Sequence, residues 1–403
     1  MDFETHYTPE EEREREALRR ELRAWLPEHV EGVGAPPDAA ALAREQFDRN
    51  RAFLRALGGR GWYAPTWPAE YGGGGLSPAV ARVIREELDA GIPHLENVHP
   101  PGDIGGSVAG ALEHVGTDEQ KRRFLPLILR GEVITWELHS EPDAGSDLPS
   151  LKSTAVRAGD QYVLNGTKAF AGGHFEADYL FFMAVTDPQG ARRRNLSTFL
   201  VPIDAPGITI TDMDLIAGSK KRTMIFQDVR VPVSHMVGRE GEGWTAFSVG
   251  LHGALTVGIG PSLDRDEHVI AQLIEYCKTA HVDGERLSSR PDVRDVLTQA
   301  YVDFHMQRLL RLRTDWMAEA GLPITYEGAQ VVLGRKLFDL ELGQAIHRAL
   351  GPLSMIDDPR WAPLGGDLEY FHRYAVLMVH PGGTVEIQKL RMFRGMAEGR
   401  SPD

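Results

Sequence analysis

The segment HSEPDAGSDL at residues 139–148 carries side chains that could hold an anionic ligand. Ser140 and Ser146 supply hydroxyl groups, which can hydrogen-bond the oxygen atoms of such a ligand. Gly145 has no side chain, so a ligand can come close to the backbone N–H groups around it. The pattern favours a loop that contacts an anionic cofactor.

A second segment with this chemistry, HPGGTVEIQK, lies at residues 380–389. Gly382 and Gly383 precede Thr384 at the expected start of a helix, and a helix N-terminus favours phosphate because its first N–H groups are unpaired. A turn followed by an ordinary capped helix has the same composition. The pattern alone therefore leaves both interpretations open, a phosphate site and a capped helix.

Several other kinds of site are excluded by the residues present. The chain has no G-x-G-x-x-G, no G-x-x-x-x-G-K-[ST] and no H-E-x-x-H motif, and its 15 histidines are dispersed, so no metal site is expected. Cys277 is the only cysteine, which excludes an internal disulfide, a thiolate zinc site and a Cys-x-x-Cys redox pair. These features predict a reducing, cytoplasmic location.

Length and charge narrow the class of protein further. The 403 residues suit two or three packed domains, with 42% hydrophobic and 25% charged residues as in ordinary globular proteins. Lys and Arg number 44 against 58 Asp and Glu, which gives a net charge of −14. Because phosphate-backbone recognition needs a surplus of basic residues on one face, a nucleic-acid partner is not expected.

Two segments bear on export and membrane insertion. The first residues, MDFETHYTPEEERERE, are acidic and polar, unlike the basic and then apolar start of a secretory signal. Trp244–Leu263 contains no Asp, Glu, Lys or Arg, and twenty such residues could span a bilayer. It is rich in glycine and contains Pro261, so we interpret it as a buried helix and expect no membrane span.

The elements that position these residues follow from hydrophobic periodicity and turn signals. Thr8 and Glu11 have the spacing of a capping box, as do Thr117 and Gln120, and a further helix is predicted over 38–57. The first 131 residues are therefore expected to be mostly helical.

Short apolar runs separated by turns follow from about residue 132, which predicts an antiparallel β domain at 132–236. Long helical patterns then return, including Val293–Ala320 and Tyr326–Leu350. The predicted fold class is α+β, with an N-terminal all-α domain at 1–131, a central β domain and a C-terminal helical bundle at 237–403.

The chain resembles the acyl-CoA dehydrogenase superfamily of flavoproteins over nearly its whole length. The matching stretches, in chain order, are WYAPTWPAEYGGGGLSP, GTDEQKRRFLPLILRGE, SEPDAGSD, YVLNGTKAF, IFQDVRVP followed by VGREGEGW, and GGTVEIQ. The resemblance implies an N-terminal helical domain, a central antiparallel β-barrel and a C-terminal four-helix bundle. It also implies an oligomer with FAD bound between subunits, a role in lipid metabolism, and an acyl-CoA thioester as substrate.

The resemblance carries cofactor contacts onto particular residues. The family's hydroxyl residue before Glu-Pro, which hydrogen-bonds the flavin ring, is Ser140 here, and Ser146 and Asp147 correspond to the Ser-Asp pair near the pyrophosphate. Thr384 and Glu386 match the two polar residues of the C-terminal motif that approach FAD. For Lys168, turn chemistry and strand termination account for the residue without a ligand.

The catalytic base is where the sequence departs from this family. The reaction needs a carboxylate that removes the proton beside the thioester carbonyl, while flavin N5 takes hydride from the neighbouring carbon. One branch of the family places this glutamate just before the Gly-Thr of the C-terminal motif, and here that position is Gly382. The other branch places it in a stretch that corresponds to residues 249–256, which hold no acid. Both base positions are empty.

The segment that lies against the flavin in this family also differs here. Where the family reads N-G-x-K-x-W-I-T, this chain reads NGTKAFAGG, with Phe170 in place of Trp, Ala171 in place of the aliphatic residue and Gly172 in place of Thr. One aromatic face is kept, and one hydrogen bond is lost. We therefore expect Phe170 to contact the cofactor.

Two residues could substitute for the missing base. Glu137 precedes Ser140 by three residues, where relatives commonly have a neutral amide, so its carboxylate could face the flavin pocket; a structural ion pair is the alternative. His252 lies beside the empty helical position, where a hydrogen-bonded core histidine is the alternative.

The leading hypothesis is an FAD-linked dehydrogenase that introduces an α,β double bond into an acyl-CoA thioester and passes electrons to an electron-transfer flavoprotein or another acceptor. The missing bases favour a subunit that completes the FAD site of a heteromer, while a related chain carries the base. A homo-oligomer with a relocated base is the competing version. Two alternatives come from other classes: a flavin-dependent oxygenase or oxidase of the same fold, and a non-catalytic scaffold subunit.

Overall fold

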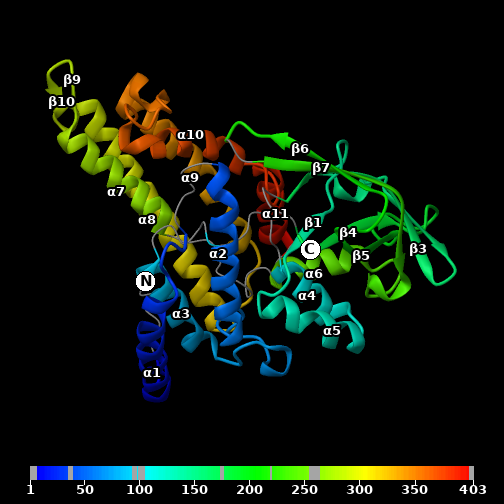
Figure 1. Ribbon diagram of the computed structural model, residues 1–403. Helices are drawn as coiled ribbons and strands as arrows, with labels where there is room; N and C mark the ends of the chain where they lie inside the picture. Colours follow the sequence, from blue (N-terminus) through cyan, green and yellow to red (C-terminus); the bar gives the residue numbers. More distant parts are fainter. Residues whose placement is uncertain are drawn as a thin grey trace. The chain divides into compact units, whose positions relative to one another are not determined.

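The computed structural model describes residues 7–34, 40–92, 98, 105–172, 177–217, 220–253 and 264–398 (Figure 1). The chain divides into two compact units. The first unit contains the described residues of 7–215 and 220–253. The second unit contains the described residues of 264–398 together with Ile216 and Ala217. The boundaries predicted at 131/132 and 236/237 remain predictions.

The first unit begins with helices, as expected. They are α1 (Pro9–Trp25), α2 (Ala40–Gly59), α3 (Pro78–Gly91), α4 (Gly105–Val115) and α5 (Asp118–Leu129), with short 3-10 turns η1 (Leu26–Glu28) and η2 (Ala69–Tyr71). Both capping boxes are confirmed: the Glu11 N–H donates to the Thr8 hydroxyl over 3.2 Å, and the Gln120 N–H donates to Thr117 over 3.2 Å. These side chains pair N–H groups that a helix start leaves free.

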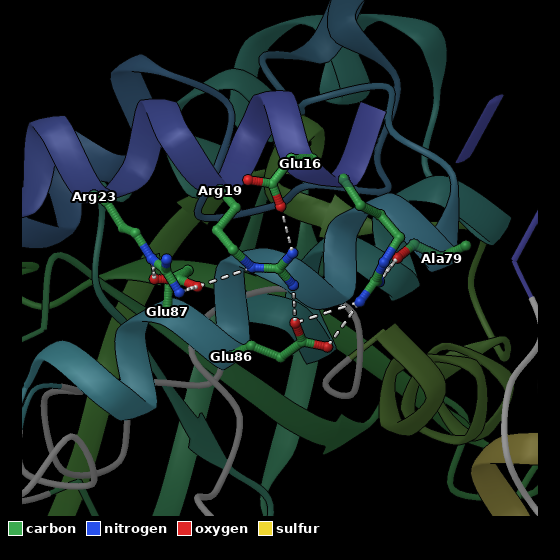
Figure 2. Close-up of polar contacts among 7 residues, drawn as sticks. Glu16, Arg19, Arg23, Ala79, Glu86 and Glu87 are labelled. Carbon is green, nitrogen blue, oxygen red and sulfur yellow. Dashed lines mark hydrogen bonds and ion pairs between the residues drawn. The ribbon is translucent and has the colours of Figure 1, made fainter. Parts of the chain in front are cut away.

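An arginine and glutamate cluster joins α1 to α3 (Figure 2). Glu87, on α3, is 9% exposed at its side chain and accepts from Arg19 Nε over 3.1 Å and from Arg23 Nε over 2.8 Å. Glu86 accepts from Arg19 Nη2 over 2.8 Å and from Arg15 Nη2 over 3.1 Å. Each carboxylate thus bridges two guanidinium groups, which holds the first helix against the third.

The β region of the first unit is one eight-stranded sheet. Its strands are β1 (Thr135–Leu138), β2 (Thr154–Ala158), β3 (Gln161–Ala171), β4 (Tyr179–Val185), β5 (Leu196–Pro202), β6 (Ile208–Asp214), β7 (Lys220–Pro232) and β8 (Met236–Val237). Short 3-10 turns η4 (Leu148–Ser150) and η5 (Val233–His235) lie between strands. The order is β6-β7-β3-β2-β4-β5-β8, with β1 paired to β4.

Two pairings differ from the antiparallel pattern that we predicted. β1 pairs with β4 in parallel, Thr135 opposite Tyr179, and β2 meets β4 in a parallel pairing at Thr154 and Val185. A parallel neighbour needs a crossover connection, whereas an antiparallel one can follow a hairpin. Here the β2–β3 hairpin lies between β1 and β4 in the chain and provides that connection. The other strand pairings are antiparallel.

The last helix of the first unit is α6 (Gly243–Gly253). It packs closely on α4, since a Cβ at Gly250 would lie 2.6 Å from the Ser107 carbonyl oxygen. This helix includes the first ten residues of the uncharged segment Trp244–Leu263, which we interpreted as a buried helix. Residues 254–263 lie outside the described part of the chain. Among the described residues, none of the helices combines the length and apolar character that a membrane crossing requires.

The second unit is helical. It contains α7 (Asp264–Thr279), α8 (Pro291–Glu319), α9 (Glu327–Leu350), α10 (Asp367–Met378) and α11 (Val385–Glu398), with a small hairpin of β9 (His281–Val282) and β10 (Glu285–Arg286) and 3-10 turns η6 (Leu287–Ser289), η7 (Gly351–Met355) and η8 (Pro363–Gly366). α9 contacts α8, α10 and α11 around an apolar core. The predicted order of helices, sheet and helices is confirmed.

Candidate functional site

Ser140, which follows β1, and Phe170, near the end of β3, are linked through one backbone hydrogen bond. The Ala169 N–H donates to the Ser140 carbonyl over 2.9 Å. The Ser140 hydroxyl makes no hydrogen bond to any other residue that the structure describes. Phe170 has a φ of 60°, and its large apolar side chain is 57% exposed. The backbone thus places a residue with a hydroxyl beside the residue that precedes an exposed aromatic ring, and these are the two kinds of group that a planar polar ligand requires.

Lys168 fixes the backbone around Ser140. It is fully buried, and its Nζ donates to the His139 carbonyl over 3.1 Å and to Glu141 Oε1 over 2.9 Å, the residues on either side of Ser140. Burial lowers the pKa of Lys168 to about 8, although the Glu141 carboxylate opposes this shift. Lys168 lies within β3 and not at a turn or a strand end, so the expected turn chemistry is not its role; it holds the backbone on both sides of Ser140 through these two contacts.

Glu141, which pairs with Lys168, also binds two backbone N–H groups. We call the Lys168–Glu141 ion pair and these hydrogen bonds the clamp. It accepts from the Lys152 N–H over 2.7 Å and from the Ser153 N–H over 2.9 Å, in addition to the Lys168 ammonium. Burial acts to raise the pKa of Glu141, but Lys168 and these hydrogen bonds hold it below its ordinary value. The loop of residues 141–153 is thereby tied to β3 through one buried ion pair.

Ser146 lies on the exposed side of that loop. A Cβ placed at Gly145 would meet no atom within 4 Å, so the backbone beside Ser146 is open to a ligand, as the sequence suggested. Asp147, the next residue, forms an ion pair with Arg192 of the β4–β5 connection. The loop therefore presents a hydroxyl and open backbone next to a charged pair.

Gly172 shows a physical reason why the segment NGTKAFAGG differs from the family pattern N-G-x-K-x-W-I-T. Its φ is 51°, and a Cβ there would lie 2.3 Å from Cδ2 of the Trp136 indole, which is 1% exposed. The space that a threonine side chain would occupy is filled by an aromatic ring from β1. The lost hydroxyl at this position is thus matched by a gain of packing at Trp136.

Thr384 and Glu386 belong to the second unit. The Ile387 N–H donates to the Thr384 hydroxyl oxygen over 3.3 Å, so Thr384 caps α11, and Glu386 is exposed in its first turn. The capped-helix interpretation of this segment is confirmed. Since the cap uses only the oxygen lone pair, the Thr384 hydroxyl can still donate a hydrogen bond.

Gly382, at the family's base position, is exposed with a φ of 67°, and a Cβ there would meet nothing within 4 Å. The turn around it is well fixed. Lys336 Nζ donates to the Pro381 carbonyl over 2.6 Å, and Gln388 Nε2 donates to the Gly382 carbonyl over 2.8 Å. The position therefore has room for a side chain on a well-held backbone.

Glu137 and His139 lie on the same side of the chain where β1 ends, and Glu137 Oε1 is 4.0 Å from His139 Nε2. Burial raises the pKa of Glu137, and the Ser107 side chain on α4 opposes the shift. Burial also lowers the pKa of His139 to about 3, with Lys168 as a second cause, so the imidazole is neutral. The alternative of an ion pair for Glu137 is not seen with any Lys or Arg in the described residues.

His252, the other substitute base considered, lies in α6, and its side chain is outside the described part of the chain. The sequence analysis did not single out His139, Ser107 or Trp136. A signal for His139 was present, because a histidine two residues after an acid at a strand end places both on one face. Burial without a partner, however, appears only in the fold.

The described residues contain no group of three or more His, Cys, Asp or Glu side chains arranged to hold a metal ion. Ser140, Ser146 and Phe170 lie in the first unit, whereas Thr384, Glu386 and Gly382 lie in the second, and each set is described by itself. The predicted roles of these residues remain predictions.

Three sequence models of acyl-CoA dehydrogenase domains together match nearly the whole chain. The N-terminal domain matches residues 12–132, the middle domain residues 138–229 and the C-terminal domain residues 241–397. Acyl-CoA dehydrogenase FadE26 of Mycobacterium tuberculosis is 30% identical over 398 residues, which cover 95% of this chain and 95% of the relative.

Solved structures of similar proteins give the same result. The crystal structure of the ChsE4–ChsE5 complex from Mycobacterium tuberculosis contains a chain with a TM-score of 0.77 and 28% identity, covering 98% of this chain and 99% of that chain. The Tcur3481–Tcur3483 steroid ACAD has a TM-score of 0.77 at 25% identity, with complete coverage of both chains, 100% each.

Proposed function

The chain belongs to the acyl-CoA dehydrogenase family, and we propose that it is the subunit without a catalytic base in a heteromeric, FAD-linked acyl-CoA dehydrogenase. A related chain would supply the glutamate. The proposed reaction is α,β-dehydrogenation of an acyl-CoA thioester, with a ring-bearing acyl group as the favoured substrate class. An electron-transfer flavoprotein or a similar acceptor would take the electrons.

The observation that carries this proposal is the residue at the family's base position. Gly382 has no side chain that could accept a proton, although its backbone is held by Lys336 and Gln388 and the space beside it is open. The backbone of this turn is thus fixed by hydrogen bonds, while the carboxylate that would remove the proton is missing. That combination fits a subunit that keeps its architecture and leaves proton abstraction to a partner.

Two further observations support a two-chain assembly. Two similar solved structures carry the names of two chains each, the ChsE4–ChsE5 complex and the Tcur3481–Tcur3483 steroid ACAD, and the second name also supports a ring-bearing substrate. In the second unit, α11 exposes Leu390, Phe393 and Met396 at helical spacing. Exposed apolar faces of this kind mark surfaces that bind other protein chains.

The residues present fit a flavin cofactor. Phe170 offers an exposed ring held at positive φ, Ser140 offers a hydroxyl without a partner in the described structure, and the open backbone beside Gly145 suits a phosphate group. We propose that Ser140, Ser146 and Phe170 hold FAD, and that Thr384 and Glu386 contact an FAD as well. Bound FAD supplies the hydride acceptor for the reaction.

The chain's own contribution is then to bind and orient. Lys168 and Glu141 fix the backbone on both sides of Ser140, so the backbone that carries the hydroxyl is in place before the cofactor binds. Preorganisation of this kind reduces the entropy that binding must otherwise supply. Proton removal is assigned to the partner's carboxylate, because neither family position in this chain has an acid.

Reconstitution with a related chain tests the proposal. The visible absorbance of the chain purified alone reports bound flavin, and substoichiometric flavin is expected. Adding a related chain that retains the glutamate should restore both flavin binding and turnover, with activity that saturates at an equal subunit ratio. Within the complex, replacing the partner's glutamate by glutamine should abolish turnover, whereas Glu137→Gln in this chain should leave most of it.

The opposite results would show a different enzyme. Stoichiometric flavin and turnover by the chain alone, lost in Glu137→Gln, would establish a homo-oligomer with a relocated base. Rapid oxygen consumption by the reduced protein without acyl-CoA turnover would establish an oxidase or oxygenase instead.

A further inference from the structure

A cavity of about 520 Å³ lies in the first unit where α2 and α5 end, and it shares no residue with the candidate site described above. Its volume is in the range of about 300–1,000 Å³ that small-molecule sites have. Four of its six lining residues are exposed, so it opens to solvent. The cavity therefore gives a small molecule both room and access. Its lining residues are Arg55, Gly59, Leu127, Arg130, Glu132 and Val133.

The backbone around this cavity is fixed by close packing and hydrogen bonds. A Cβ at Gly58, in the last turn of α2, would lie 2.1 Å from the Arg130 carbonyl oxygen, so the ends of α2 and α5 are in contact. The turn after α5 is closed by the Leu127 carbonyl, which accepts from the Glu132 N–H over 2.9 Å and from the Val133 N–H over 3.2 Å. The wall is thus in place before a ligand arrives, which lowers the entropy cost of binding.

Two guanidinium groups line the cavity with N–H donors that no other described residue uses. Arg55 Nη2 donates to the Glu132 backbone carbonyl over 3.3 Å, and no second hydrogen bond from Arg55 occurs within the described residues. The Arg130 stem lies over Gly72, whose Cβ position is 3.1 Å from Arg130 Cγ, and its guanidinium has no partner among the described residues. Because each guanidinium has five N–H donors, the pair can bind the oxygen atoms of an anion.

The other groups on the wall limit which anion fits. The exposed Glu132 carboxylate forms no ion pair within the described residues, and it can only accept hydrogen bonds, so the ligand must also carry a hydroxyl or an amino group. The half-buried side chains of Leu127 and Val133 add an apolar surface. An amino acid would bring one negative charge to two guanidinium groups, whereas a phosphate monoester brings two and accepts paired hydrogen bonds from each.

We propose that this cavity binds a free nucleoside monophosphate. The phosphate is bound by Arg55 and Arg130, and a ribose hydroxyl or the amino group of the base donates to Glu132. The base lies against Leu127 and Val133. The inference is independent of the proposed function, because none of these residues contributes to the flavin or acyl-CoA contacts argued above.

Calorimetric titration of the full-length protein, alone or in the complex in which it is isolated, tests this with AMP, inorganic phosphate and adenosine. One AMP should bind per chain, at least tenfold more tightly than either of the other two probes. Glu132→Ala should strengthen phosphate binding, because a repelling charge is removed, and so narrow the advantage of AMP. Equal affinity for AMP and phosphate in the wild-type protein would overturn the proposal, as would the absence of AMP binding.

Three arginine variants locate the site. Arg55→Met and Arg130→Met should each weaken AMP binding about tenfold, the loss expected for a charged hydrogen bond. The Glu132 carbonyl keeps its 3.1 Å bond from Arg51 in the first variant, so the turn stays closed. Arg122→Met is the matched control, because it removes the same charge from an exposed position of α5 outside the cavity and should leave the affinity unchanged. Equal losses in all three variants would show that general charge attracts the nucleotide.

Adenosine phosphates are also part of CoA and FAD, so the titration is repeated with saturating CoA and again with saturating FAD. An unchanged AMP affinity supports a site for the free mononucleotide. Displacement of AMP by either larger molecule would assign the cavity to that molecule and overturn the proposal.

A measurement on the wild-type protein needs no variant. AMP should protect Arg55 and Arg130 from modification by phenylglyoxal, read by mass spectrometry of peptides, while Arg122 is modified equally with and without AMP. Equal modification of all three arginines would show that solvent alone fills the cavity. Neither binding nor protection depends on turnover, so failure of the heteromer proposal would leave both results unaffected.

Discussion

The Trp136 indole lies where a side chain at Gly172 would stand. A Cβ added to Gly172 would come within 2.3 Å of Trp136 Cδ2, a distance that real Cβ contacts do not reach. Trp136 lies in β1, and Gly172 directly follows the end of β3, so the two residues come from separate parts of the chain. A glycine that looks like a lost ligand contact in the sequence is therefore a packing requirement in the fold.

Restoring the family's threonine should accordingly fail on its own. Gly172→Thr forces the ring out of a filled core at a residue with a φ of 51°, so we expect a loss of about 3 kcal/mol or more in the free energy of unfolding, measured by urea denaturation. Trp136→Ala alone should also destabilise strongly. The double variant should be more stable than the sum of the two losses predicts, and strict additivity would refute the packing explanation.

Removing the Lys168 ammonium should affect both stability and cofactor affinity. Lys168→Met leaves the Glu141 carboxylate buried without its ion-pair partner, which costs about 3–5 kcal/mol, and frees the backbone beside Ser140. We expect a lower midpoint of urea unfolding and weaker FAD binding. Lys152→Met is the matched control, because Lys152 is exposed and pairs only with exposed Asp143. Equal effects in the two variants would contradict the clamp.

The neutral state of His139 makes stability depend on pH. Its pKa is about 3 in the folded protein against an ordinary 6.5, so the unfolded chain takes up a proton that the folded chain does not. The free energy of unfolding should therefore fall as the pH falls from about 6.5 towards 3, by up to about 1.4 kcal/mol per pH unit.

His139→Phe should flatten that dependence, which denaturation at a series of pH values measures. Glu137 has a raised pKa and acts in the opposite direction, since the folded chain takes up its proton first as the pH falls. Its contribution is present in both proteins, so the difference between the two curves reports His139. Parallel curves would show that the buried imidazole is protonated in the fold.

A carboxylate at residue 382 should be able to take over proton abstraction. The expected result for Gly382→Glu, in a complex whose partner has its glutamate replaced by glutamine, is recovery of measurable turnover. The side chain has open space, and the φ of 67° costs about 1–2 kcal/mol for a residue with a Cβ. Gly382→Gln carries the same strain without a base, so activity in that variant would show that the recovery has another origin.

The bridge between α1 and α3 should be among the more sensitive electrostatic features of the first unit. Glu87→Ala removes the carboxylate that joins Arg19 and Arg23 (Figure 2), and because Arg23 is 65% exposed and Arg19 keeps Glu86 as a partner, we expect a loss of about 1–2 kcal/mol in unfolding free energy. Glu16→Ala removes an exposed partner of Arg19 and should change stability by less than about 0.5 kcal/mol. Thermal denaturation compares the two, and equal losses would show that the partly buried Glu87 contributes no more than an exposed partner.

The sequence was enough to predict the elements that local signals define. The capping boxes at Thr8 and Thr117 and the long helices of the second unit depend on neighbours in the chain, so periodicity finds them. The parallel pairing of β1 with β4 depends on a partner more than forty residues away, Thr135 with Tyr179, and no local signal specifies it.

The candidate site shows the same division. Ser140 and Phe170 could be named from their motifs, and their proximity follows from one backbone hydrogen bond at Ala169. That Trp136 fills the place beside Gly172, or that His139 is buried without a partner, depends on which side chains meet in space. These are packing facts, and a motif that lists residue types in order does not contain them.

The open space at Gly382 also bears on how such a chain can change over generations. The glycine codons GGA and GGG differ from the glutamate codons GAA and GAG by one base, so where either glycine codon stands at this position a single transition introduces the acid. No neighbouring atom lies within 4 Å of the new Cβ, so no compensating substitution is needed. The assignment of proton abstraction to one subunit would then depend on one mutational step, and selection for growth with a partner gene whose glutamate codon is replaced should find that step.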